Sequence, residues 1–189
     1  MKDGNEAAAR VVDAFDKLGI NYLLAGSYSS NYYGIPRATR DADFVAVLSK
    51  GVTPLAGELG SEFELDPQPS FESVTGTMRD IFAIPALQFK IEIFHLSNDA
   101  HDQSRFERRK KVFDELIARE VFIPSAEDVI ITKLRWAVRA KRSKDADDIR
   151  DVIAVQGNAL DWEYVHRWTA EHGTRKLLDE IRASIPPLD

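Results

Sequence analysis

Two aspartates stand two positions apart in a short apolar stretch, at Asp41 and Asp43. The side chains of a β-strand alternate between its two faces, so a strand over 41–48 places both carboxylates on one face. Like charges side by side are costly without a counterion, and hard oxygen ligands suit Mg²⁺. The pair therefore predicts a divalent-metal site. The other interpretation is the start of a strand at which both carboxylates are solvated.

A third carboxylate lies further along the chain, in a second stretch with β-like alternation. Glu92 stands between Ile91 and Ile93 within the predicted strand 87–96. A lone glutamate in such a strand is more often a surface residue on a half-exposed sheet, so its weight depends on the aspartate pair. If the two strands are neighbours, all three carboxylates converge on one site.

A hydrophobic run at 21–25 leads directly into Gly26 and Ser27. Glycine lets a backbone approach a phosphate closely, and serine adds a hydroxyl and an amide at a helix start, where anions are favoured. The other interpretation is an ordinary turn after a strand. Together with the carboxylates, this loop supplies what nucleotidyl transfer needs, namely a holder for a triphosphate and ligands for two metal ions.

The set Gly26-Ser27, Asp41-x-Asp43 and Glu92 resembles the signature of the DNA polymerase β-like nucleotidyltransferases. The segment around the aspartates is similar to that of minimal bacterial and archaeal members and of abortive-infection, toxin-type members. The resemblance implies an α/β fold, with a mixed sheet, flanking helices and an all-helical C-terminal part. It also implies that Asp41, Asp43 and Glu92 bind two Mg²⁺ ions, that Ser27 contacts the donor nucleoside triphosphate, and that Glu92 is a candidate general base.

Basic residues near the aspartate pair are candidates for phosphate binding. Arg37 and Arg40 flank the pair and are well placed to meet phosphate oxygens, although Arg40 could also simply balance the charge of Asp41. Two further basic clusters could grip an RNA backbone or the triphosphate, and otherwise form solvated faces paired with acidic neighbours. These clusters are Arg105, Arg108, Arg109, Lys110 and Lys111, and Arg135, Arg139, Lys141, Arg142 and Lys144.

The C-terminal part contributes a lysine and an aspartate on neighbouring helices. Lys133 lies within the apolar arc of a helix predicted over 125–142, and Asp145 lies on the buried stripe of the next helix. Asp148, at the edge of that stripe, is a more exposed rival for the site. The pair resembles a lysine and an aspartate that serve the nucleotide site of toxin-like nucleotidyltransferases, which implies catalytic roles for both and nucleotide binding by Lys133. The other interpretation is a buried Lys133–Asp145 ion pair.

The elements that position these residues divide the chain near Pro124. We expect an α/β nucleotidyltransferase domain over 1–124 and a helical region over 125–189 packed on it, with the active site in the cleft between sheet and helices. The predicted helices are 5–18, 27–33, 50–59, 125–142 and 145–155, with one more from 161 and one after 174. The predicted strands are 21–25, 41–48, 79–84, 87–96, 112–117 and 120–123.

Composition restricts the class of protein. The 31 acidic residues outnumber the 25 basic ones and give a net charge of -6, whereas proteins that coat nucleic acid with their whole surface are usually basic. The absence of cysteine excludes disulfides, thiolate zinc sites and cysteine nucleophiles. The sequence lacks both a signal-type apolar core and an apolar run of about eighteen residues, so we expect no membrane contact and a cytoplasmic protein.

The predicted function is transfer of a nucleoside monophosphate from a nucleoside triphosphate to an acceptor hydroxyl. The acceptor stays open among tRNA 3′ ends, proteins and small hydroxylated molecules such as antibiotics. The toxin resemblance favours RNA and implies a toxin–antitoxin pair with an antitoxin protein as partner. The alternative is a non-catalytic module that keeps the nucleotidyltransferase shape and binds a nucleotide or a partner protein.

Overall fold

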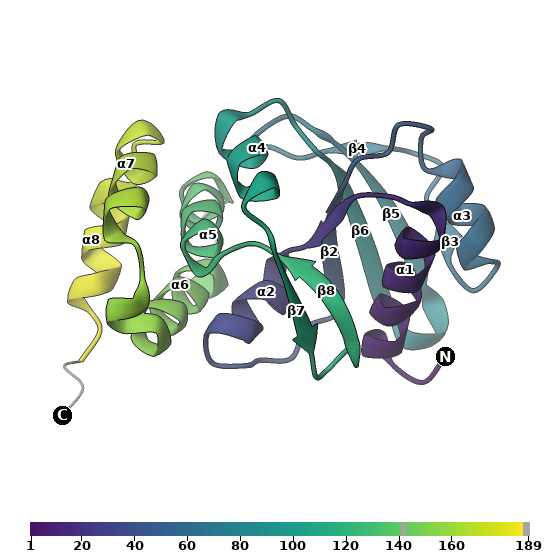
Figure 1. Cartoon of the computed structure of the whole chain (residues 1–189), viewed down its shortest axis with the longest axis horizontal. Coiled ribbons are helices and arrows are strands. Elements are labelled where there is room, and N and C mark those ends of the chain that lie inside the picture. The colour runs from purple at the N-terminus through teal and green to yellow at the C-terminus, as the bar shows by residue number, and fades with distance from the viewer. Residues whose placement is uncertain (141–142, 187–189) are drawn as a thin grey trace. The chain divides into compact units, whose positions relative to one another are not determined.

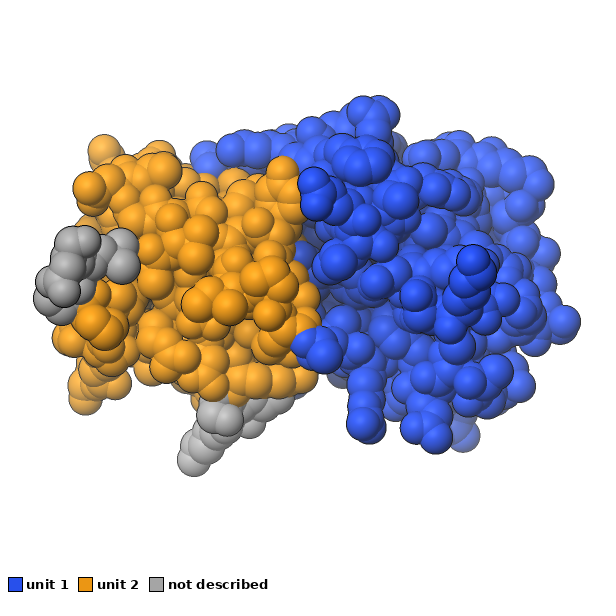
Figure 2. Space-filling model, turned by 90° about the horizontal axis from the view of Figure 1, so that it is seen from below, with its two compact units in different colours: residues 1–28, 38–124 blue, residues 29–37, 125–189 orange. Residues whose placement is uncertain are grey.

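The computed structural model describes residues 1–140 and 143–186 (Figure 1). The chain forms two compact units, coloured in Figure 2. Unit 1 comprises residues 1–28 and 38–124, and unit 2 comprises 29–37 and 125–189. Unit 2 thus takes a segment from the N-terminal part of the sequence, and α2 (Gly26–Tyr33) begins in one unit and ends in the other.

Unit 1 is built on a six-stranded mixed sheet (Figure 1). Its order is β1-β2-β6-β5-β3, and β4 pairs with β5. The β2–β6 pair is parallel, whereas β1–β2 and β5–β6 are antiparallel, which confirms the predicted mixed α/β class. The strands are β1 (Tyr22–Leu24), β2 (Asp41–Ala46), β3 (Glu64–Leu65), β4 (Ser70–Phe71), β5 (Met78–Ile84) and β6 (Phe89–His95).

One face of this sheet packs in the hydrophobic core of unit 1. The ring of Phe44 in β2 lies 5.4 Å from that of Phe15 in α1, and Tyr22 stacks on Phe15 at 4.9 Å. All three side chains are fully buried, so α1 covers the face of β2 that carries Phe44. The other elements of unit 1 are α1 (Gly4–Leu18), α3 (Thr53–Leu59), the 3₁₀ turn η1 (Pro85–Leu87), α4 (Ala100–Glu107), β7 (Lys110–Asp114) and β8 (Arg119–Ile123).

Unit 2 contains four helices of the C-terminal part, as the sequence predicts. Ser125 caps the first helix, since its Oγ accepts from the backbone N–H of Asp128, and the carboxylate of Asp161 accepts from the N–H of Tyr164 at the start of the third. These side chains satisfy N–H groups that a helix start leaves unpaired. The elements are α5 (Ala126–Ala140), α6 (Ser143–Gln156), the 3₁₀ turn η2 (Gly157–Ala159), α7 (Trp162–Glu171) and α8 (Arg175–Ala183).

The hairpin of β7 and β8 differs from its predicted limits. The first of these strands was expected to reach residue 117 but ends at Asp114. The carboxylate of Asp114 accepts hydrogen bonds from the backbone N–H groups of Leu116 and Ile117, and Ala118 has a φ of 55°. An aspartate that bonds the backbone two and three residues on forms a turn, so the strand stops there.

No helix within the described part of the chain combines the length and apolar character that a membrane crossing requires.

Candidate active site

The three predicted metal-binding carboxylates lie on two neighbouring strands. In the parallel pairing of β2 with β6, Asp43 is the register partner of Glu92. Ala42 and Phe44, the residues on either side of Asp43, are fully buried against the core, whereas Asp43 is half-buried. Because residues alternate along a strand, Asp41, Asp43 and Glu92 share the face of the sheet opposite to the α1 core.

The Gly26-Ser27 turn lies directly against Asp43. Gly26 has a φ of +58°, and a Cβ added to it would lie 1.8 Å from the Asp43 Oδ2. The N–H of Ala25 donates to the backbone carbonyl of Asp43 at 2.7 Å, which ties the end of β1 to β2. A side chain at position 26 would therefore displace the carboxylate, and glycine alone fits both the backbone angle and the space.

Asp41 and Glu92 each have a polar side chain that restrains their carboxylate. The hydroxyl of Thr39 donates to the Asp41 Oδ1 at 2.6 Å, and a guanidinium N–H of Arg79 donates to the Glu92 Oε2 at 2.8 Å. Arg40 has an exposed side chain, and its carbonyl accepts from the N–H of Lys90 at 3.1 Å. Three half-buried carboxylates on one face are a hard-oxygen donor set, which fits Mg²⁺.

The predicted site residues of unit 2 form a buried ionic network. The Lys133 Nζ lies 2.6 Å from the Asp148 Oδ2 and 3.4 Å from the Asp145 Oδ1. Arg37 binds the Asp148 carboxylate with two N–H groups, at 2.6 and 2.7 Å. The hydroxyl of Ser30 lies 3.4 Å from the same carboxylate. The structure thus brings Arg37, Lys133 and Asp145 together around Asp148.

Asp148 is slightly more exposed than Asp145, as predicted, but both side chains are buried. The side chains of Asp145 and Asp148 are 3% and 5% exposed, and Asp148 is the closer partner of Lys133. Burial by itself raises the pKa of Asp148, but hydrogen bonds from Arg37 and the charge of Lys133 outweigh it and hold this pKa below its ordinary value. The Lys133–Asp145 ion pair of the other interpretation is present, but it is the longer of the two contacts.

Two residues of the first basic cluster make contacts inside unit 1, whereas Arg108, Lys110 and Lys111 are exposed. Arg105 is buried and pairs with Asp102 at 3.1 Å. The guanidinium of Arg109 lies over the ring of Phe106 at 4.3 Å, and Lys111 pairs with Glu120 at 2.7 Å. In the second cluster, Lys141 and Arg142 lie outside the described residues. Charges that are already paired or stacked are poor candidates for an RNA-binding surface.

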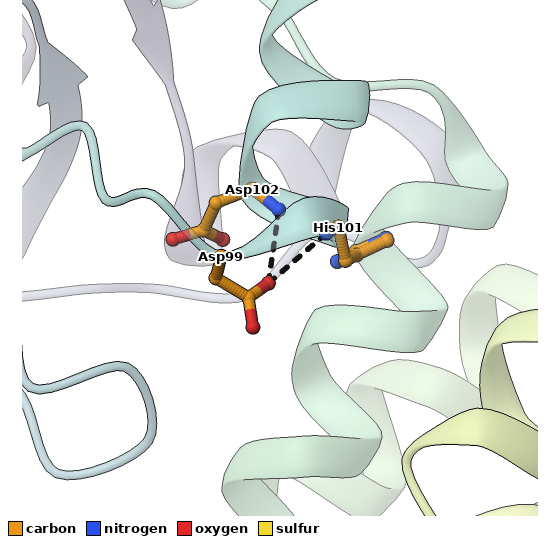
Figure 3. A group of neighbouring side chains, drawn as sticks. All are labelled: Asp99, His101 and Asp102. Atoms are coloured by element: carbon orange, nitrogen blue, oxygen red, sulfur yellow. Dashed lines mark hydrogen bonds between the residues drawn. The ribbon is translucent and has the colours of Figure 1, made fainter.

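A second group of potential ligands lies at the start of α4. Asp99, His101 and Asp102 offer ligand atoms within 4.8 Å of one another. Asp99 accepts from the N–H groups of His101 and Asp102, and Asp102 accepts from the hydroxyl of Ser97 and pairs with Arg105. In Figure 3 the His101 ring and the Asp102 carboxylate extend to opposite sides of the Asp99 carboxylate. These acids cap a helix and hold an arginine, and their ligand atoms and that of His101 also lie close enough together to hold a metal ion.

The sequence pattern did not predict several residues of the site region. Thr39, Arg79 and Ser70 become visible as partners only once the strands are paired. The face on which Asp148 lies was predictable, because it stands three positions after Asp145 and residues at that spacing share a helix face.

Comparisons with known proteins identify the fold. No family model and no curated protein matches the sequence significantly. Among solved structures, the antibiotic-resistance factor ANT(2″)-Ia matches with a TM-score of 0.63 at 13% identity, covering 95% of this chain and 96% of that one. An antigenic nucleotidyltransferase-like protein from Paracoccidioides brasiliensis matches with a TM-score of 0.55 at 18% identity, over 98% and 96% of the two chains.

A third match adds an enzyme with a bound ligand. The lincosamide antibiotic adenylyltransferase LnuA, in its lincomycin-bound form, matches with a TM-score of 0.51 at 15% identity, covering 77% of this chain and 93% of that one. At these identities the likeness defines the fold. The chain therefore has the fold of polymerase β-like nucleotidyltransferases, as its motifs predict.

Proposed function

On this nucleotidyltransferase fold, we propose that the chain is a metal-dependent enzyme that transfers a nucleoside monophosphate from a nucleoside triphosphate to an acceptor hydroxyl. One observation carries the proposal. Asp41, Asp43 and Glu92 lie on one face of two neighbouring strands, and Gly26 lies directly against the central carboxylate. A triphosphate-binding turn beside a set of hard-oxygen ligands is what this reaction requires.

The chemistry follows from these groups. Asp41, Asp43 and Glu92 would hold Mg²⁺, which supplies charge stabilisation for the phosphates. Gly26 and Ser27 lie at the start of α2, where phosphate oxygens are favoured, and Ser27 is buried there. The acceptor oxygen bonds to the α-phosphorus while the bond from that phosphorus to the bridging oxygen breaks and pyrophosphate leaves. Glu92 is the candidate base for the hydroxyl proton.

We also propose phosphate-binding roles for two cations of unit 2. We assign Lys133 and Arg37 to triphosphate binding, with Asp145 and Asp148 as the carboxylates that hold them when no nucleotide is bound. Arg40, whose side chain is exposed beside the aspartate pair, is the third proposed phosphate contact. Cations oriented in advance lose less conformational entropy when a phosphate arrives.

A small hydroxylated molecule is the proposed acceptor. Two solved structures of the same fold support this class, because one is ANT(2″)-Ia in complex with adenylyl-2″-tobramycin and the other is LnuA with lincomycin. The buried Arg105 and the stacked Arg109 weaken the reason for expecting an RNA acceptor, and the net charge of -6 opposes it further. A cationic or neutral acceptor suits an acidic protein better than a polyanion does.

The test is incubation of the purified chain with each α-labelled nucleoside triphosphate, Mg²⁺ and either a panel of aminoglycoside and lincosamide antibiotics or total RNA. The proposal expects label in a small acceptor, with one pyrophosphate released per label. Label in RNA would retain the enzyme class but change the acceptor. Mg²⁺-dependent nucleotide binding without pyrophosphate release, for every acceptor, would contradict catalysis and favour the non-catalytic binding module.

A further inference from the structure

An arginine that no sequence motif singles out lies beside the third carboxylate. Arg79 is in β5, next to β6 in the sheet, and its guanidinium donates to the Glu92 Oε2 at 2.8 Å. The side chains of Arg79 and Glu92 are 27% and 17% exposed, so the pair is largely shielded from solvent. Arg79 therefore contacts the third of the three proposed metal-binding carboxylates.

The guanidinium of Arg79 is itself held from two further sides. Its Nε–H donates to the hydroxyl of Ser70 at 2.9 Å, and Ser70 is its register partner on β4. The ring of Phe94, two residues after Glu92 on β6, lies 5.6 Å from the guanidinium carbon. Three strands therefore fix one planar cation, which in turn can fix the carboxylate it binds.

Each carboxylate of the proposed site has a different restraint. Asp41 accepts from Thr39, and Asp43 is packed against Gly26. Glu92 has one more rotatable bond than an aspartate, so it loses more conformational freedom when it is held in place. We propose that Arg79, oriented by Ser70, is the positioning residue that aims Glu92 at the metal site. This role rests on the proposed function and adds a residue to it.

A measurement of metal binding can distinguish an orienting role of Arg79 from a purely electrostatic one. If Arg79 acts only as a positive charge, its removal lowers the repulsion of a cation and tightens metal binding. If it orients Glu92, its removal weakens metal binding because the carboxylate turns away. Lys90 provides the matched control, since it is an exposed cation two positions before Glu92 on the same face of β6 and is the register partner of Asp41.

The experiment is a direct titration with Mn²⁺ of the unaltered chain and of the variants Arg79→Gln, Ser70→Ala and Lys90→Gln, with thermal melting as a check on folding. We expect Arg79→Gln to bind Mn²⁺ about 10-fold more weakly, as is usual when a partner of a metal ligand is lost. Ser70→Ala should weaken binding in the same direction by a smaller factor, and Lys90→Gln should leave it equal or tighter. The turnover number should fall in Arg79→Gln while the nucleotide KM changes little.

Two results would overturn the role of Arg79. One is Mn²⁺ binding by folded Arg79→Gln that equals or exceeds that of Lys90→Gln. If Arg79→Gln does not fold, the other is unchanged binding by Ser70→Ala, which leaves the Arg79–Glu92 ion pair in place but frees the guanidinium. An unaltered chain that binds no Mn²⁺ would remove the proposed metal site together with this role. An unaltered chain that binds Mn²⁺ without transferring nucleotide would contradict the proposed function alone, and the variant comparison would still decide the role of Arg79.

Discussion

Gly26 shows how a single residue type is required by two independent constraints. Its φ of +58° disfavours any side chain, and a Cβ would also collide with the Asp43 carboxylate. Gly51 has a similar φ of +71°, but no atom lies within 4 Å of where its Cβ would be. Replacing either glycine by a residue with a Cβ therefore strains the backbone, but only at Gly26 would that Cβ also collide with another atom.

This pair of glycines gives the first prediction. Gly51→Ala should lower the free energy of unfolding by about 1 kcal/mol, the cost of a left-handed backbone. Gly26→Ala should cost more stability and also lower kcat/KM by about 100-fold, because it would displace the proposed metal-binding carboxylate of Asp43. Thermal melting and steady-state kinetics of both variants measure the difference. Equal behaviour of the two variants would contradict the close contact with Asp43.

The second prediction concerns Asp148, which pairs with the buried Lys133 and the partly exposed Arg37. Asp148→Asn leaves Lys133 and Arg37 without their main partner and should lower the free energy of unfolding by about 3 kcal/mol, the low end for a broken buried pair because Arg37 is partly exposed. Asp147→Asn is the matched control, since Asp147 is the exposed neighbour on the same helix and pairs only with Arg150 among the described ion pairs. Its effect should stay within about 0.5 kcal/mol.

The pH dependence of this contribution has a definite sign. The folded pKa of Asp148 lies below its ordinary value of 3.8, so its stabilisation is fully present above that value and is lost as the pH falls through the folded pKa. Denaturant unfolding of the unaltered chain between about pH 5 and about pH 2 should therefore show a steeper loss of stability than the same titration of Asp148→Asn. Parallel curves would show that Asp148 does not titrate differently in the folded protein.

Residue spacing predicts some of these contacts and misses others for physical reasons. The period of two places Asp41 and Asp43 on one face, and the structure has them there. Arg79 was not predicted, because its contact depends on which strands pair and in which register. Asp148 is only slightly more exposed than Asp145, and its spacing from Asp145 indicates a shared helix face.

At the level of elements, one face of β2 lies in the hydrophobic core and the other carries the proposed metal-binding aspartates. Its Phe44 packs against Phe15 and Tyr22 on one face, and its aspartates lie on the other. Phe44→Ala should lower the free energy of unfolding by about 3–5 kcal/mol, the usual cost of an emptied aromatic site. Phe113→Ala, which alters a side chain that is 60% exposed, should change it by no more than about 0.5 kcal/mol. Similar losses in denaturant unfolding would contradict the two-faced strand.

Elements with strong local signals were predicted better than short ones. The helices α5 and α7 begin at side-chain caps that the sequence displays, at Ser125 and Asp161. The two-residue strands β3 and β4 are too short to show any periodicity, and only their pairing with β5 defines them. The helix α4 contains Arg105 of the first basic cluster, whose burial no charge count reveals.

For the whole molecule, the fold class was predictable but the strand order was not. The order β1-β2-β6-β5-β3 places the sixth strand in the chain beside the second, a choice that depends on contacts distant in the sequence. The motifs nonetheless indicated the nucleotidyltransferase fold, which solved structures at 13–18% identity share. Local patterns thus predicted the residues of the fold's signature, and non-local pairing determined how they meet.

The charge of the whole chain yields a prediction about nucleic acid. With a net charge of -6, and with Arg105 paired and Arg109 stacked inside unit 1, the chain should bind labelled RNA weakly in fluorescence anisotropy. A protein with several free phosphate contacts loses affinity by orders of magnitude between about 50 and about 200 mM salt. Tight binding with that steep salt dependence would contradict the small-molecule acceptor and return RNA to first place.

The mass of the product shows whether the carboxylates of β2 and β6 catalyse nucleotidyl transfer, as we propose. The acceptor found by the labelling screen is incubated with its nucleoside triphosphate, Mg²⁺ and the unaltered chain, Asp43→Asn or Asp66→Asn, and its mass is followed over time. Asp66 is an exposed loop aspartate whose carboxylate accepts from the N–H of Gln68, so it is a matched control. The unaltered chain and Asp66→Asn should add one nucleoside monophosphate at equal rates, and Asp43→Asn should be at least about 100-fold slower. Equal rates for all three would contradict the assignment of the site.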